Sequence, residues 1–351
     1  MKLHSLVIPY LLLVSFYTPR LNHLTAKDIQ AINHSPYNGI AVPLIWQDNA
    51  NPLNFSLFSA SIGYIRKKCK KNILPWVFFN RFYGYYNKNK AASVPYFKKI
   101  QGMDLYNKTG ALGDFYRIWG FALTAALKLK SPGIVVDMED YNDETGHDYN
   151  LKYLAKTLNQ PVDQVKRRLE AIGSHLVEIA NKQYPHACIW FLYSGLGNPQ
   201  IKKFDYLTPT YFVIGMLKEA KALHSKLQFV SGGELSLAYC SSSVSDLRRK
   251  ILERFMFLKP WMMMYPNLHL AGTIAPWNKR ELKHGFFAKG VCGHAPFSNL
   301  NDFQPIFHEL FYWYRYIWIY AAWGVGYNPY NDKIAMPYNK ALQQAKQTFW
   351  K

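Results

Sequence analysis

Short apolar runs rich in β-branched and aromatic residues alternate with longer helical patterns along almost the whole chain. Seven such runs are readable, at residues 39–46, 73–80, 133–139, 188–194, 227–234, 268–277 and 316–323. Eight helical patterns accompany them, at residues 25–33, 55–71, 112–130, 161–183, 210–223, 244–259, 303–314 and 339–349. Strands that alternate with helices in this way are typical of βαβ units, and therefore of a parallel sheet.

The N-terminal apolar run supplies the eighth strand that this alternation needs. Residues 6–16 are apolar after the short basic start Met1-Lys2, as in a secretory signal, but Pro9 interrupts them and no A-x-A-like cleavage site follows. The run is also too short to span a bilayer, which takes about 20 apolar residues. We therefore predict a strand at residues 11–18, ended by Pro19, in place of a cleaved signal.

Eight strands and eight helices predict an α/β fold, a single (β/α)8 TIM barrel. A chain of 351 residues fits about two average domains or one such barrel. No internal repeat or break in composition divides it, so we expect one barrel domain over residues 1–351. The strand starts lie about 44 residues apart on average, against about 31 in a minimal barrel, which indicates long βα loops.

Two carboxylates close the fourth predicted strand, and in a closed parallel barrel the chemistry lies at the C-terminal strand ends. The two-residue period of a strand places Asp137 and Glu139 on one face. Two carboxylates so close do not both ionise easily, and the one with the raised pKa suits a general acid. Alternatively, Asp137 caps the next loop or pairs with a base, and Glu139 is solvated. The cost of burying a carboxylate pair favours the functional interpretation.

A further carboxylate, Glu234, follows two glycines at the end of the sixth predicted strand. Gly232 and Gly233 allow the backbone to turn sharply or to approach a ligand closely; a plain turn is the alternative. Together, Glu139 and Glu234 provide the two carboxylates that glycoside cleavage uses, one to protonate the leaving oxygen and one as base or nucleophile. A retaining enzyme would hold them about 5 Å apart and an inverting enzyme about 6.5 to 9.5 Å apart.

Aromatic residues, which make up 17% of the chain, suit a saccharide ligand. Sugars present apolar C–H faces that stack on aromatic rings, and their hydroxyls find phenol and indole donors. Several aromatic residues, together with one asparagine, lie at or near the C-terminal ends of predicted strands. These candidate substrate-binding residues are Trp46, Asn80, Tyr141, Tyr193, Tyr239, Trp277, Trp318 and Trp323. For any single aromatic residue, a place in the core is the competing interpretation.

Five short motifs, taken in order, resemble those of a family of bacterial TIM-barrel glycoside hydrolases. They lie at residues 36–40 (PYNGI), 133–141 (GIVVDMEDY), 211–217 (YFVIGML), 232–234 (GGE, with Tyr239) and 316–320 (YIWIY). The resemblance implies a (β/α)8 fold, a saccharide substrate and a D-x-E-x-Y motif at Asp137, Glu139 and Tyr141. Two positions depart from the pattern: Ser231 replaces an Asp before the glycines, and Ala321-Ala322 replaces an acidic residue after the W-x-Y.

The fourth strand is also similar to that of family 18 chitinases, whose pattern D-G-x-D-x-D-x-E ends in the catalytic acid. Asp137 and Glu139 match the last two acidic positions, whereas Val135 replaces the preceding Asp. If this similarity governs the mechanism, the N-acetyl group of the substrate is the nucleophile and Glu234 is dispensable.

Charge and cysteine content limit the other functions. The net charge is +20, and the densest run of cations, residues 66–71, ends a helical pattern, where cations complement the helix dipole. No helix-turn-helix, RNP or zinc-finger pattern accompanies the charge, so no specific nucleic-acid partner is expected. The cysteines are far apart, without C-x-x-C or histidines at zinc spacing, so no metal or other cofactor is expected.

The sequence therefore predicts a glycoside hydrolase with Glu139 as general acid/base, Asp137 orienting and tuning it, and Glu234 as nucleophile or base. A second hypothesis is a barrel that binds a saccharide without cutting it, motivated by Ser231 and Ala322. A third, binding of an anionic polymer, rests on the charge alone. The same charge would suit an acidic polysaccharide as the substrate of the hydrolase.

Overall fold

The computed structural model of the protein describes residues 12–16, 21–44, 55–78, 111–138, 151–192, 194–196, 208–233, 241, 243–274, 303–319 and 335–349. The strands are β1 Leu12–Phe16, β2 Gly39–Pro43, β3 Asn72–Phe78, β4 Gly133–Asp137, β5 Cys188–Phe191, β6 Gln228–Ser231, β7 Leu268–Ile274 and β8 Tyr316–Ile319. The helices are α1 Ala26–His34, α2 Phe55–Lys68, α5 Ala111–Leu129, α6 Leu151–Thr157, α7 Val162–Gln183, α8 Thr208–Ala222, α9 Val244–Met264, α11 Phe303–Trp313 and α12 Ala335–Phe349, with a 3-10 turn at Leu21–His23. The predicted alternation of strands and helices is confirmed.

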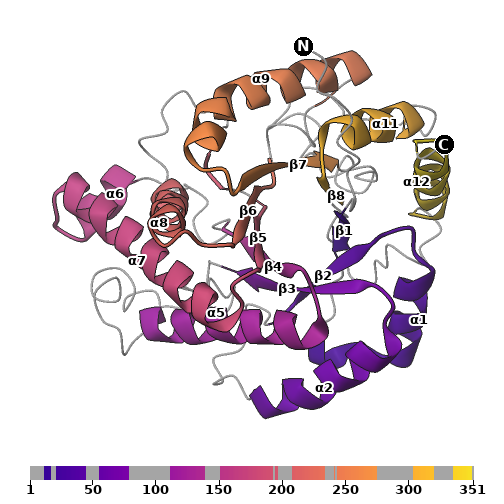
Figure 1. Ribbon diagram of the computed structural model, residues 1–351, viewed down its shortest axis with the longest axis horizontal. Coiled ribbons are helices and arrows are strands. Elements are labelled where there is room, and N and C mark those ends of the chain that lie inside the picture. The colour runs from indigo at the N-terminus through magenta and orange to yellow at the C-terminus, as the bar shows by residue number, and fades with distance from the viewer. Residues whose placement is uncertain are drawn as a thin grey trace.

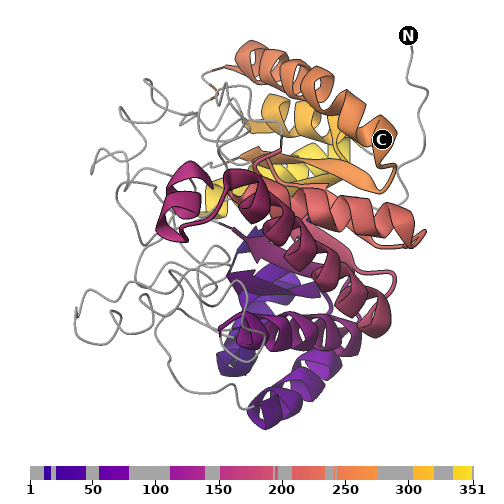
Figure 2. The ribbon, with the colours of Figure 1, turned by 90° about the vertical axis from the view of Figure 1, so that its left-hand side faces the viewer.

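The strands form one parallel sheet in chain order, as the sequence predicts. Each strand pairs with the next, and β8 pairs with β1, so that the sheet closes into a barrel. The helices surround the strands (Figure 1) and run alongside them in the side view (Figure 2). Because all strands run the same way, their C-terminal ends meet at one end of the barrel, where the sequence places the candidate site.

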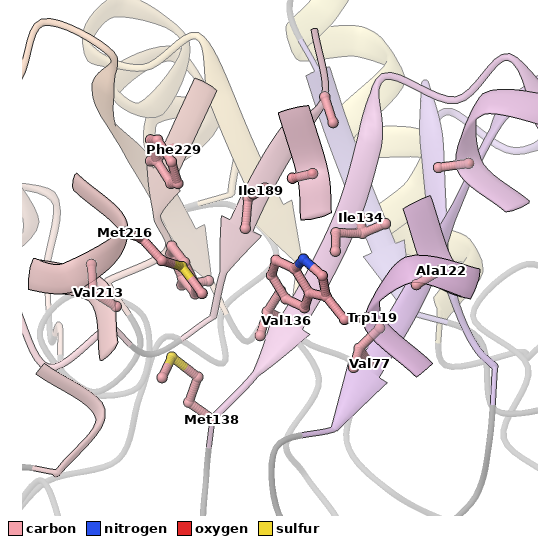
Figure 3. Packing of buried hydrophobic residues seen from close by; sticks show 14 of the residues in the cluster. Val77, Trp119, Ala122, Ile134, Val136, Met138, Ile189, Val213, Met216 and Phe229 are labelled. Carbon is pink, nitrogen blue, oxygen red and sulfur yellow. The ribbon is translucent and has the colours of Figure 1, made fainter. Parts of the chain in front are cut away.

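Side chains along β4 alternate between the helix layer and the barrel interior. Ile134 and Val136 of β4 belong to the large core between sheet and helices, where they lie around Trp119 of α5 (Figure 3). Val135 and Asp137 consequently face the barrel interior. All four strand residues are buried. Burial on both faces explains why β4 is a nearly continuous apolar run in the sequence.

Aromatic and polar side chains fill the N-terminal half of the barrel interior. The rings of Trp190 from β5 and Tyr316 from β8 meet edge to face, with their centroids 5.7 Å apart. His269 from β7 lies 5.7 Å from the same Tyr316 ring and hydrogen-bonds the Gln228 side chain. Burial raises the pKa of the Cys188 thiol in β5 to about 12. This half of the interior is therefore a packed layer of side chains.

Helices α7 and α8 pack closely through facing glycines. A Cβ atom on Gly173 of α7 would lie 2.1 Å from the Phe212 carbonyl oxygen, and one on Gly215 of α8 would lie 2.0 Å from the Glu170 carbonyl oxygen. The Ser174 hydroxyl of α7 donates a hydrogen bond of 3.3 Å to the Gly215 carbonyl. Backbone that approaches this closely leaves no room for a methyl group.

We expect Gly215→Ala to lower the free energy of unfolding by about 2 kcal/mol, because the added methyl forces α7 and α8 apart. Gly63→Ala is the matched control, since a Cβ there meets nothing within 4 Å on helix α2. It is expected to stabilise the protein by about 0.5 to 1 kcal/mol through helix propensity. Chemical denaturation measures both changes, and equal shifts in the same direction would contradict the account of the α7–α8 contact.

Some helices differ from the prediction. Helix α2 ends at Lys68, three residues before the predicted end, and α12 begins at Ala335, four residues before the predicted start. Helix α9 continues through Pro260 to Met264, although proline usually ends a helix and the sequence predicts an end at residue 259. Because Pro260 has no N–H, the carbonyl of Met256 one turn earlier loses its helical hydrogen-bond donor. Both residues are exposed, so water can bind that carbonyl. Helix α6, in the segment predicted as the loop after the fourth strand, is missed entirely. Strands β2 and β5 also end earlier than predicted, at Pro43 and Phe191.

Candidate active site

Asp137 is the last residue of β4 and faces the barrel interior at its C-terminal end. Its side chain is buried, and it pairs in register with Phe78 of β3. The next residue, Met138, is fully buried in the helix layer on the side of Val136 (Figure 3). The strand alternation thus continues through Met138, which fixes the inward orientation of Asp137. Glu139, the next position of the same parity, lies outside the described residues.

The end of β6 packs tightly against its surroundings. A Cβ atom on Gly232 would lie 2.5 Å from the carbonyl oxygens of both Phe191 and Leu192. Gly233 has a φ of +73°, and a Cβ there would lie 2.2 Å from a guanidinium nitrogen of Arg254. Both glycines are therefore required by the protein's own close packing and by a left-handed backbone turn. Glu234 follows directly in sequence and lies outside the described residues.

A buried arginine of α9 holds this turn. The Arg254 guanidinium donates hydrogen bonds to the Ser231 carbonyl (2.7 Å), the Ser231 hydroxyl (3.0 Å) and the Ala271 carbonyl of β7 (2.8 Å). Burial lowers the pKa of Arg254, an effect that the neighbouring Tyr314 opposes. The guanidinium thereby joins the end of β6 to the middle of β7.

Ser231, which departs from the family pattern, belongs to this network. Its hydroxyl lies 2.8 Å from the hydroxyl of Ser194, which in turn accepts a hydrogen bond of 3.2 Å from the Leu196 amide. The side chains of Ser231, Ser194 and Arg254 are all buried. A serine at position 231 gives Arg254 a neutral acceptor.

Trp318 of β8 is the one predicted substrate-binding residue within the described part of the chain. It is fully buried, and its indole N–H donates a hydrogen bond of 3.0 Å to the Gly232 carbonyl. In this position it supports the turn that precedes Glu234. Its predicted contact with a saccharide stays a prediction.

Main-chain hydrogen bonds connect the ends of β4 and β6 through β5. The Leu192 amide donates to the Val136 carbonyl (3.0 Å), and the Gly232 amide donates to the Phe191 carbonyl (2.6 Å). The ends of β4, β5 and β6 therefore stand side by side at the same end of the barrel. The roles of the other candidates stay predictions because they lie outside the described residues: Glu139, Glu234, Trp46, Asn80, Tyr141, Tyr193, Tyr239, Trp277 and Trp323.

Sequence reasoning missed Arg254, although the sequence contains a signal for it. The buried positions of α9 include Leu247, Ile251, Arg254 and Leu258, a spacing that places the arginine on the apolar face of the helix. A charged residue on such a face needs hydrogen-bond partners within the fold.

No candidate metal centre arises in the part of the chain that the structure describes: it contains no group of three or more His, Cys, Asp or Glu side chains that could hold a metal ion.

Solved structures share the fold, whereas no protein-family model and no curated protein matches the sequence. A GH5-4 broad specificity endoglucanase from an uncultured bacterium matches with a TM-score of 0.54 and 10% identity, over 96% of this chain and 95% of that chain. PbGH5A, a glycoside hydrolase family 5 enzyme from Prevotella bryantii B14, matches with a TM-score of 0.54 and 8% identity, over 96% of each chain. The GH113 β-mannanase AaManA from Alicyclobacillus acidocaldarius gives a TM-score of 0.51 and 9% identity, over 97% of this chain and 98% of that chain. At this identity the similarity shows the fold alone, a TIM barrel that these three hydrolases share.

Proposed function

We propose that the protein is a glycoside hydrolase, in which residues 1–351 form one (β/α)8 TIM-barrel domain that cleaves a glycosidic bond in a poly- or oligosaccharide. Glu139 acts as general acid/base and Glu234 as nucleophile or base. Asp137 orients and tunes Glu139. The mechanism is the two-carboxylate cleavage used by most glycosidases.

The arrangement of β4, β5 and β6 carries this proposal. Neighbouring strands lie about 4.8 Å apart, so the backbones of β4 and β6, with β5 between them, are separated by about 10 Å. Glu139 follows the end of β4 by two residues, and Glu234 follows the end of β6 by three. Side chains from two backbones at this spacing can bring carboxyl groups within the separations of about 5 to 9.5 Å that glycosidases use.

Burial of Asp137 supports the role given to Glu139. A second carboxyl group that faces the same barrel interior disfavours another negative charge close to it. Glu139 would then hold its proton more readily and could deliver it to the leaving oxygen of the sugar. Asp137, held at the end of a strand, would also restrict the orientations of that group.

The structural neighbours suggest the first substrates. Their names describe an endoglucanase and a β-mannanase, and PbGH5A is also matched as a complex with a xyloglucan tetradecasaccharide, at a TM-score of 0.56. Glucans, mannans and xyloglucan are therefore the neutral polymers to test. The net charge of +20 adds acidic polysaccharides, whose carboxylate or sulfate groups it would attract.

A saccharide-binding barrel without catalysis is the second candidate, and the Ser231 network favours it. In the related family this position carries an acid, whereas here a neutral serine is bound to Arg254 and Ser194. The site would then retain a saccharide-binding surface but lack part of its acidic machinery.

Release of reducing sugar from neutral, acidic and amino-sugar polymers, measured beside binding of the same polymers, tests the proposal. We expect at least one polymer to be both bound and cut. Binding without release over long incubation would favour the non-catalytic barrel. Neither binding nor release of any polymer would contradict both candidates.

A further inference from the structure

The end of the barrel opposite the candidate active site is formed by the turns that lead from helices into strands. In a parallel barrel every helix ends, and every strand begins, at this end. Figure 2 shows the helices and strands running side by side between the two ends. We call the surface made by these αβ turns the basal face. It comprises residues 66–71, 128–132, 182–187, 221–227, 263–267 and 314–315.

The basal face is strongly basic. Its segments contain many lysines and arginines and no aspartate or glutamate. Exposed cations come from the turns around most of the barrel: Lys70 before β3, Lys130 before β4, Lys182 before β5, Lys226 before β6 and Arg315 before β8.

The cations of the basal face are not neutralised within the described part of the chain. None of these five side chains makes an ion pair with a described carboxylate. Among the described residues, exposed ion pairs form on helices, within one helix as for Arg249 with Asp246 or between two as for Lys218 of α8 with Glu170 of α7. The positive charge of the basal face is therefore directed to solvent.

Exposed aliphatic side chains lie on or beside the same face. Leu127 in the last turn of α5 is 49% exposed, and Leu223, just after α8, is 48% exposed. Met263 and Met264 at the end of α9 are 74% and 52% exposed. Stabilisation of helix dipoles explains cations at helix ends, but it gives no reason for exposed leucine and methionine there. The combination of basic and aliphatic groups is typical of surfaces that bind the bilayer interface.

We propose that the basal face docks on an anionic lipid bilayer. Its cations are distributed around the barrel axis, so a plane can contact them together, whereas a linear polymer would follow only one line of them. The aliphatic side chains would enter the boundary between headgroups and acyl chains. Surfaces for single-stranded nucleic acid instead use several aromatic residues for stacking, whereas the exposed apolar side chains on or beside this face are mostly aliphatic, with Tyr312 at the end of α11 as an aromatic exception. No helix of the described residues is long and apolar enough to cross a membrane.

This orientation places the barrel axis roughly along the bilayer normal. The C-terminal strand ends, with Asp137 and the β6 turn, then face away from the lipid. Docking by the basal face leaves that end of the barrel open to solutes, whatever reaction it carries out.

Sedimentation with lipid vesicles tests the proposal. We expect the full chain to bind vesicles of phosphatidylcholine with about 30% phosphatidylserine, and to bind pure phosphatidylcholine far more weakly. Each cation near such a surface contributes about fivefold in affinity. Loss of three cations alone gives about 100-fold, and the three added carboxylates repel the surface further, so the triple variant Lys130→Glu/Lys226→Glu/Arg315→Glu is expected to lose at least about 100-fold in partitioning to the anionic vesicles.

A matched control changes the net charge equally at the other end of the helices. Lys27, Arg167 and Lys340 are exposed in the first two turns of α1, α7 and α12. The variant Lys27→Glu/Arg167→Glu/Lys340→Glu is expected to stay within about threefold of wild type, because these positions lie beyond a Debye length of about 8 to 10 Å from the lipid. Equal losses in the two triple variants would overturn the proposal.

A variant that keeps the net charge tests the contribution of the exposed aliphatic side chains to membrane binding. Leu223→Ser/Met263→Ser is expected to weaken vesicle binding by about tenfold with no change in charge, since both side chains would leave the acyl boundary. Unchanged binding, or equal binding of wild type to neutral and anionic vesicles, would overturn the proposal. Tighter binding of wild type to heparin or duplex DNA than to the anionic vesicles would identify a polymer surface and also overturn it.

Discussion

Glu139→Gln is expected to lower turnover of any saccharide that the protein cleaves by about 10²- to 10⁴-fold, while binding of that saccharide stays within a few-fold of wild type. Glutamine preserves the size and the hydrogen-bonding capacity of the side chain but cannot deliver a proton to the leaving oxygen. Initial rates of reducing-sugar release, measured beside equilibrium binding, separate these two effects. Glu178→Gln, an exposed position on α7, is the control and should keep the wild-type rate.

Glu234→Gln distinguishes the two catalytic schemes that the sequence leaves open. In the two-carboxylate mechanism this variant also loses turnover, since the nucleophile or base is removed. In a substrate-assisted mechanism of the chitinase type, the N-acetyl group of the substrate replaces it, and only amino-sugar polymers are cut. Full activity of Glu139→Gln would contradict both schemes.

The sequence could predict the order of strands because strands such as β2, β4, β5 and β8 are buried on both faces. Such strands form short, nearly continuous apolar runs that stand out between helical patterns. The C-terminal ends of the strands are harder to predict, because apolar residues continue beyond the last residue that pairs with a neighbouring strand. In the apolar run that starts at Gly39, for example, strand β2 ends at Pro43 although Leu44 is also apolar. The end of α9 was also predicted wrongly, at the residue before Pro260. Whether a proline ends a helix depends on whether the carbonyl that loses its donor, here that of Met256, can bind water, and this depends on the fold and not on the local sequence.

The candidate site also has one part that the sequence predicts and one part that it does not. The inward orientation of Asp137 follows from strand period alone, and the structure shows it at the end of β4. Arg254 lies 23 residues from its partner Ser231 and 17 from Ala271, so its role depends on how α9 packs against the end of β6 and the middle of β7. Helical period places it on the apolar face but does not identify those acceptors. Local patterns therefore find the groups on strands and miss the side chain that supports them from a helix.

Arg254→Met is expected to lower the free energy of unfolding by about 3 kcal/mol. Methionine keeps much of the apolar stem but removes the guanidinium. The buried carbonyls of Ser231 and Ala271 and the hydroxyl of Ser231 then lose a donor, each at a cost of about 1 to 3 kcal/mol. Relief from burying a cation offsets part of that cost. Chemical denaturation followed by circular dichroism measures the change.

The same helix offers the control for Arg254→Met. Arg249 is exposed and, among the described residues, forms ion pairs with Asp246 and Glu253 along the surface of α9, so Arg249→Met should leave the denaturation midpoint close to wild type. Arg254→Lys, which keeps a charge and fewer donors, is expected to fall between wild type and Arg254→Met. Equal midpoints for the methionine variants at positions 249 and 254 would show that the guanidinium does not hold the β6 turn. If it does hold it, Arg254→Lys should also lower turnover more than it weakens saccharide binding, because Glu234 follows that turn directly.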